Sequence, residues 1–197
     1  MKGVENMRTV KVLADRKVYD LDELNEQARE FAIENHQIDL EKVFIDECIP
    51  RYDKAIEIFC KVFCVKLLGY DEIFNGINFD FEITDKNVLE QDTPTKLLSY
   101  VIFKYDSNWR EKLQNENVLE YFHEICGFIK PMNDFLSGEK AYSEYYDIIN
   151  DCFDNFFNGM YKEGQEMTSY ESVIKDINKM HLEFFDDGTI ASGIFEK

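Results

Sequence analysis

The stretch Arg51–Gly69, which reads RYDKAIEIFCKVFCVKLLG, decides how the rest of the chain must fold. Four polar residues, Asp53, Lys54, Glu57 and Lys61, share one narrow stripe of a helical wheel, and apolar side chains cover most of the remaining circumference. These apolar residues are Ile56, Ile58, Phe59, Val62, Phe63, Val65 and Leu67. A helix with so wide an apolar face must be covered on more than one side. We therefore expect the central buried helix of the core, with Gly69 as the residue that ends it.

Two segments after this helix predict β-structure. Gly76–Thr84 (GINFDFEIT) alternates apolar and polar residues, which predicts a strand with one buried and one exposed face. Near the end of the chain, Asp187-Gly188 stands between the apolar runs Leu182–Phe185 and Thr189–Ala191. An Asp-Gly pair between two such runs predicts a β-hairpin.

Helix starts and stops punctuate the remaining sequence. Asp20 and Glu23 have capping-box spacing, and Asn25 is a second candidate N-cap, so a helix should begin near residue 25. Its residues Leu24, Ala28, Phe31 and Ala32 share one face, and it can run to about residue 37, with Asp39 capping a further helix. Pro50 and Pro131 are each expected to separate or end helices, because proline is tolerated only in a first turn.

A long amphipathic helix is predicted over residues 139–158, with Gly159 and Gly164 in the loop after it. Thr168 and Glu171 have capping-box spacing and predict one more helix. Together these patterns predict an α+β fold: a helix-rich single domain over residues 1–197, with a small antiparallel sheet and a C-terminal β-hairpin.

The charge of the chain narrows the classes of partner. Forty acidic residues against 22 basic ones give a formal net charge of −18. So large a negative charge repels the phosphates of nucleic acids, which disfavours direct nucleic-acid binding. It suits a basic partner such as a nucleic-acid-binding protein. Solubility alone also accounts for an acidic composition.

The cysteines and the hydropathy indicate a compartment. The chain has five cysteines, an odd number, and neither a CxxC motif nor a signal peptide. This pattern is typical of reduced thiols in the cytosol. No apolar run approaches the roughly 20 residues that a membrane-spanning helix needs, so we expect no membrane contact.

Four acidic residues recur at helical spacing within residues 139–158. Glu144, Asp147, Asp151 and Asp154 are three, four and three positions apart, which places them on one stripe opposite the aromatic residues. Neighbours in this row are about 4.5–6 Å apart along the helix axis, comparable to the spacing of phosphates along a strand. Like charges at this spacing weaken a helix slightly. The row is therefore either a solvated face or a surface that mimics nucleic acid and binds a partner.

Candidate catalytic groups are scattered. His36, His123 and His181 lie in three separate predicted elements, without any paired metal-binding motif. Cys60 and Cys64 are one helical turn apart, but two thiols without a second pair indicate core packing rather than a zinc site. We therefore predict no catalytic residue, no cofactor and no bound metal, and a binding protein rather than an enzyme.

One alternative is a metal-dependent enzyme. Asp80 and Glu82 project from the same face of the predicted strand, roughly 7 Å apart, and paired carboxylates of this kind can hold Mg²⁺. A nuclease would also require a lysine on an adjoining strand, and Lys86 lies beyond the end of this one. A solvated sheet face is the favoured explanation of the two carboxylates.

Both ends of the chain carry a resemblance. The segments 19–32 (YDLDELNEQAREFA) and 182–189 (LEFFDDGT) resemble a helix start and a chain ending found in small uncharacterised proteins of phages and prophages of low-GC bacteria, some of them labelled antitoxin-like. The resemblance covers about a fifth of the chain and consists mostly of capping and turn residues. It implies a phage or mobile-element origin, in the cytoplasm of a bacterial host cell, and no catalytic residue.

Three functions follow from these patterns. The first is an anti-CRISPR-like inhibitor that presents an acidic, DNA-mimicking surface to a basic nucleic-acid-handling defence protein of the host. The second is an antitoxin-like or oligomeric module that binds a protein, or a second copy of the chain, through aromatic surfaces. The third is the Mg²⁺-dependent enzyme that uses Asp80 and Glu82.

Overall fold

The computed structural model describes residues 17–71, 77–85, 96, 99, 101 and 122–191, without the side chains of 122–126. The chain divides into two compact units. The central unit is Gln37–Ser172, and the terminal unit combines Met1–His36 with Val173–Lys197. The single domain over residues 1–197 stays a prediction. In the described part of the chain, no helix is both long and apolar enough to cross a bilayer.

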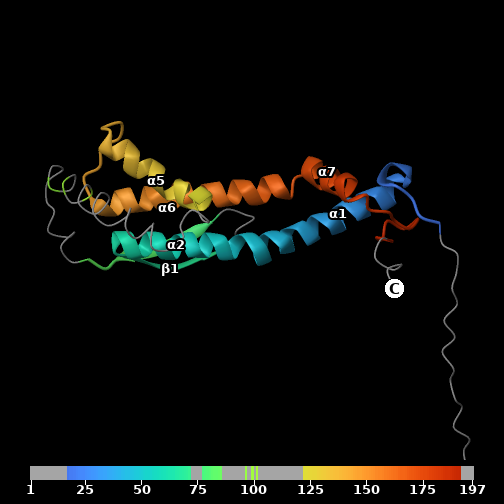
Figure 1. The fold of residues 1–197 in the computed structure, drawn as a ribbon, viewed down its shortest axis with the longest axis horizontal. Helices are drawn as coiled ribbons and strands as arrows, with labels where there is room; N and C mark the ends of the chain where they lie inside the picture. Colours follow the sequence, from blue (N-terminus) through green and yellow to red (C-terminus); the bar gives the residue numbers. More distant parts are fainter. Residues whose placement is uncertain are drawn as a thin grey trace, which may run out of the picture. The chain divides into compact units, whose positions relative to one another are not determined.

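The chain is helical without a break from Glu26 to Phe63. The helix α1 (Glu26–Val43) is followed by a π-helical segment, η2 (Phe44–Cys48), and then by α2 (Ile49–Phe63) (Figure 1). The predicted boundary at Asp39 is therefore wrong, whereas Pro50 lies in the first turn of α2 as expected, after a π turn rather than a break between helices. Pro50 cannot donate to a carbonyl one turn earlier, and the wider π turn before it accommodates the missing hydrogen bond.

The opening stretch is a helix only in its first part. The helix α2 ends at Phe63, because Cys64 adopts the left-handed conformation with φ 52° and ψ 49°. The chain then forms β1 (Val65–Asp71), which pairs antiparallel with β2 (Asn78–Ile83). The prediction that the helix continues to Gly69 is wrong, since Val65 and Leu67 also fit a strand and their pairing partners lie in β2. The strand predicted over residues 76–84 is confirmed as β2.

The second half of the central unit is a helical pair. The helices α5 (Phe122–Leu136) and α6 (Tyr145–Met167) contact one another, with α5 beside the first part of the longer α6 (Figure 1). The predicted end at Pro131 is wrong: this residue lies inside α5. Its ring nitrogen has no hydrogen for the carbonyl of Gly127, and the side-chain amide of Asn155 in α6 donates to that carbonyl instead.

The helix α6 also departs from its predicted span. It starts six residues later than predicted, at Tyr145, and continues through Gly159 and Gly164 to Met167. Thr168 therefore ends α6 and does not begin a helix, and its hydroxyl donates to the Gly164 carbonyl. The last helix, α7 (Tyr170–Met180), is preceded by Ser169, whose hydroxyl accepts the backbone N–H of Ser172 at 3.3 Å.

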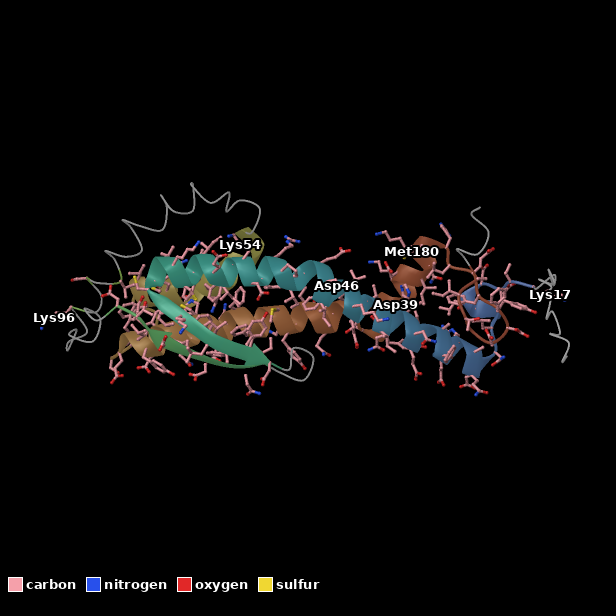
Figure 2. All side chains as sticks on the ribbon, turned by 90° about the horizontal axis from the view of Figure 1, so that it is seen from below. Lys17, Asp39, Asp46, Lys54, Lys96 and Met180 are labelled. Atoms are coloured by element: carbon pink, nitrogen blue, oxygen red, sulfur yellow. The ribbon has the colours of Figure 1, made fainter. Side chains whose placement is uncertain are left out.

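Aromatic rings form the core of the central unit. Phe128 of α5 stacks between Phe59 of α2 and Phe156 of α6, with ring centroids 4.1 and 3.9 Å apart. Phe153 meets Phe59 edge to face at 5.4 Å and Phe81 of β2 at 5.3 Å. One face of the two-stranded sheet and three helices thus share one core, and side chains fill the space between α2 and α6 (Figure 2).

The terminal unit is built around the first turns of α1 and the last described segment. A short 3₁₀ helix, η1 (Leu21–Glu23), precedes α1, and the Asn25 side chain caps α1 as predicted, accepting the Ala28 N–H at 3.1 Å. Isolated antiparallel bridges join Tyr19 to Phe184 and Phe184 to Ile190. Apart from these bridges, the described residues of the terminal unit form no strand. The predicted C-terminal hairpin is therefore not confirmed.

Candidate functional site

The four acidic residues predicted on α6 divide into two kinds. Glu144 immediately precedes the helix and Asp147 lies in its first turn, and both are exposed. Asp154, two turns further on, is also exposed. Asp151 is half-buried, and its carboxylate is held from the segment before the helix. The structure therefore keeps Asp147, Asp151 and Asp154 on one helix, places Glu144 just before it, and gives Asp151 a separate role.

Asp151 ties the start of α6 to the residues before it. Its carboxylate accepts hydrogen bonds from the Lys140 ammonium and the Tyr142 hydroxyl, and the Lys140 Nζ lies 5.0 Å from the centre of the Tyr142 ring. Partial burial acts to raise the pKa of Asp151, but the two hydrogen bonds outweigh it and lower that pKa. The same contacts raise the pKa of Lys140 to about 12. The negative charge of Asp151 is thus largely neutralised by contacts within the protein, so it contributes little to a binding surface.

The other three carboxylates remain available to a partner. Neither Glu144 nor Asp147 has an ion pair or a side-chain hydrogen bond among the described residues. Asp154 accepts a hydrogen bond from the Asn150 amide at 2.8 Å. Although the residue is exposed overall, partial desolvation of its carboxylate, followed by the nearby charge of Asp151, raises the pKa of Asp154. Without Asp151, the free charges at positions 147 and 154 are about 10.5 Å apart along the axis, so the row is sparser than a phosphate strand.

Acidic residues on α2 are engaged within the central unit. Glu57 pairs with Lys61 at 2.7 Å and Lys54 at 3.0 Å, and these hydrogen bonds, that from Lys61 first, lower its pKa (Lys54 is labelled in Figure 2). Asp53 accepts the hydroxyl of Tyr70 at 2.7 Å. The exposed end of α6 therefore differs from α2, where lysines and a tyrosine satisfy the carboxylates.

The carboxylates of the metal hypothesis lie on β2. Asp80 and Glu82 are both exposed on the same face, as predicted. The structure adds the lysine that the sequence pattern lacked, since Lys66 of β1 stands opposite Glu82 with its Nζ 3.1 Å from the carboxylate. This ion pair occupies Glu82. No cluster of three or more His, Cys, Asp or Glu side chains within the described ranges could hold a metal ion.

None of the described histidines and cysteines belongs to a cluster that could hold a metal ion. His36 is buried, with 6% of its surface exposed, and its Nε2 lies 2.9 Å from the carboxylate of Asp176 in α7. His181 is exposed after α7, and the side chain of His123 lies outside the described residues. The four described cysteines are free thiols. Burial raises the pKa of Cys60 and Cys152, which disfavours a reactive thiolate at either position.

Sequence periodicity located the acidic row and missed the residues that modify it. The predicted helix over residues 139–158 includes Lys140 and Tyr142, and its spacing puts Tyr142 on the aromatic side, away from Asp151. Both residues in fact precede α6, where helical spacing does not apply. The only signal was a Lys-x-Tyr pair immediately before an acidic helix.

Comparisons with known proteins add no relative. No protein-family model matches the chain, and neither a curated protein nor a solved structure matches it.

Proposed function

We propose that the chain is an acidic binding protein that occupies a basic nucleic-acid-binding surface of a host defence protein and so inhibits it, in an anti-CRISPR-like role. The observation that carries the proposal is the exposed acidic face of α6, formed by Asp147 and Asp154 on the helix and Glu144 just before it, in a chain with a net charge of −18. Electrostatic complementarity of this kind speeds association and selects basic partners.

The packing of α6 supports a surface role for these residues. The opposite side of the helix is fixed in the aromatic core through buried residues that include Ile149, Phe153 and Phe156. The acidic face is therefore presented on a rigid element, which lowers the entropy lost on binding. We include a phage or mobile-element origin in the proposal, because the resemblance at both ends of the chain points there.

The test is a charge reversal restricted to the free carboxylates. The variant Glu144→Lys, Asp147→Lys, Asp154→Lys leaves the structural Asp151 in place. Wild-type protein immobilised on beads should retain a basic nucleic-acid-binding protein from a bacterial lysate at low salt, and release it at high salt or on addition of a DNA duplex. The variant should retain at least tenfold less of it.

A matched control changes the net charge equally at another acidic place. Asp39, Asp46 and Glu47 lie on α1 and η2, and Asp39 and Asp46 are labelled in Figure 2. Reversing these three to lysine should leave retention close to wild type. If both variants lose retention equally, the overall charge and not the α6 face explains binding. If the α6 variant retains the partner as well as wild type, that face is removed from the proposal.

A second candidate, binding through apolar surfaces, is favoured by exposed side chains in the central unit. Leu68 of β1 and Tyr146 of α6 are 51% and 45% exposed. An antitoxin-like module or a homodimer that used them would lose binding in Leu68→Ser or Tyr146→Ser and would be nearly insensitive to salt. Light scattering of the purified chain across salt concentrations distinguishes the homodimer from the acidic inhibitor.

A further inference from the structure

An open cleft of about 420 Å³ lies in the terminal unit, beside the first turns of α1. One wall carries Asn25, Gln27 and Phe31, and the other carries Asp186 and Asp187 of the turn that follows Phe185. Its volume falls within the roughly 300–1,000 Å³ typical of ligand pockets. The α6 face described above belongs to the central unit, so this cleft is a separate place on the chain.

The walls of the cleft are fixed by backbone contacts. Gly188 has φ +85°, and a Cβ atom there would stand 2.2 Å from the Ala28 carbonyl oxygen, so the turn sits directly on the backbone of α1. The carboxylate of Asp187 accepts the backbone N–H of Thr189 at 2.9 Å and its hydroxyl at 2.6 Å. Because Asp187 maintains the turn, the carboxylate of Asp186 is the one left to face a ligand.

The lining offers a flat ring beside a negative charge. Phe31 is 44% exposed although it belongs to an otherwise apolar helix face. Asp186 is exposed and has no hydrogen bond or ion pair with another described residue. Gln27 adds an exposed amide oxygen as an acceptor. The positive end of the helix dipole opposes a cation here, and the first-turn residue Glu26 offsets it.

We propose that this cleft binds the guanidinium group of an arginine side chain presented by the partner. A guanidinium stacks on an aromatic face and donates paired hydrogen bonds to a carboxylate, whereas an ammonium group provides only a point charge. The inference rests on the proposed function for the basic character of the partner, and the net charge of −18 supplies the charge complementarity. The cleft would thus add a specific anchor to the non-specific attraction of the α6 face.

The probe is a blocked Gly-Arg-Gly peptide, titrated into the full-length ¹⁵N-labelled protein and followed by NMR. Saturable shifts should be confined to the amides around Asn25–Phe31 and Asp186–Thr189. The lysine peptide should bind more weakly, and the citrulline peptide, which keeps the shape and loses the charge, about tenfold more weakly or worse.

Two substitutions separate the ring from the charge. Phe31→Leu keeps an apolar side chain without a π face and should weaken binding of the arginine peptide about two- to fivefold. Asp186→Asn should weaken it about tenfold. The matched controls are Ile38→Ala, in α1 with 48% exposure, and Glu183→Gln, an exposed acid just before the turn, and both should bind as wild type.

The outcomes distinguish this proposal from the proposed function. Equal binding of the arginine and citrulline peptides, or wild-type affinity in both Phe31→Leu and Asp186→Asn, would overturn the arginine site. The α6 charge-reversal variant should still bind the arginine peptide at the cleft. If that variant loses the lysate partner while the cleft binds no peptide, the function survives without this anchor. If the cleft binds arginine and no basic partner is retained, the function fails.

Discussion

Each unit brings a second segment against a backbone carbonyl of a helix, but for different reasons. In the central unit, Pro131 leaves the Gly127 carbonyl of α5 without its helical donor, and a side chain from a neighbouring helix, Asn155, supplies one. In the terminal unit, the turn at Gly188 comes against the Ala28 carbonyl of α1, and only the absence of a side chain permits it. The central unit also has stacked aromatic rings around its contact, whereas the terminal unit has fewer large side chains. We therefore expect the terminal unit to tolerate less change at its contact.

The largest effect is expected from Gly188→Ala. The left-handed conformation costs a non-glycine residue roughly 1–2 kcal/mol, and the methyl group would also collide with the Ala28 carbonyl. We expect the free energy of unfolding of the terminal unit to fall by about 2 kcal/mol or more. Hydrogen exchange of the amides in residues 26–36 and 173–191 should accelerate while the central unit keeps its protection.

Gly138→Ala is the matched control for that prediction. Gly138 has nearly the same backbone conformation, φ +79°, but no atom lies within 4 Å of the position of its Cβ. This substitution should therefore show only the conformational cost of about 1 kcal/mol. Equal costs at the two glycines would show that the contact with Ala28 does not restrain the terminal unit.

The sequence predicts features that depend on residues close together in the chain and misses features that depend on residues far apart in it. Asn25 was recognisable as a cap because it satisfies an amide three residues away, and β2 was recognisable because alternation is a local property. The switch from helix to strand at Cys64 and the passage of α5 through Pro131 were missed. In both cases the deciding partner, Phe81 of β2 or Asn155 of α6, lies at least 14 residues away in the chain.

The candidate site shows the same division. Helical spacing predicts Asp147 and Asp154 on one face, and both are exposed on α6, whereas Glu144 is exposed but precedes the helix in an extended conformation. The spacing could not show that Asp151 is tied to Lys140, because the predicted helix includes residues 139–144, whereas these residues precede α6. It also grouped Phe31 with Ala28 and Ala32 on one face, whereas the turn at Asp186 leaves the ring partly exposed in a cleft.

A smaller effect is expected from removing the side-chain amide of Asn155, which replaces the backbone donor that Pro131 lacks. Asn155→Ala removes the donor to the Gly127 carbonyl and should cost about 1–2 kcal/mol in the free energy of unfolding. In the background of Pro131→Ala, which restores the helical N–H, the same substitution should cost clearly less. Urea denaturation of the four proteins gives the coupling free energy between the two positions. A coupling free energy near zero would mean that Asn155 does not replace the donor that Pro131 lacks.

The smallest effect is expected at Asp151, on the surface of the central unit. Asp151→Asn keeps the shape of the side chain but removes the charge that holds Lys140 and Tyr142, at an expected cost of about 1 kcal/mol at neutral pH. Because the pKa of Asp151 is lowered in the folded protein, its charged form stabilises the fold at every pH above its ordinary pKa of 3.8. That stabilisation should disappear as the pH falls through the lowered pKa.

The pH dependence of the unfolding free energy distinguishes the loss of this specific ion pair from a general change in net charge. The difference in unfolding free energy between wild type and Asp151→Asn should be constant from about pH 6 to 8 and shrink below about pH 4. Asp154→Asn should show the opposite sign, since the raised pKa of Asp154 means that its charged form is disfavoured in the folded protein. Asp147→Asn, on the exposed face of the same helix, should change stability by less than about 0.5 kcal/mol. If all three variants behaved alike, the acidic residues would titrate as equivalent charges. That result would contradict both the structural role of Asp151 and the conclusion that its neighbours are free to bind a partner.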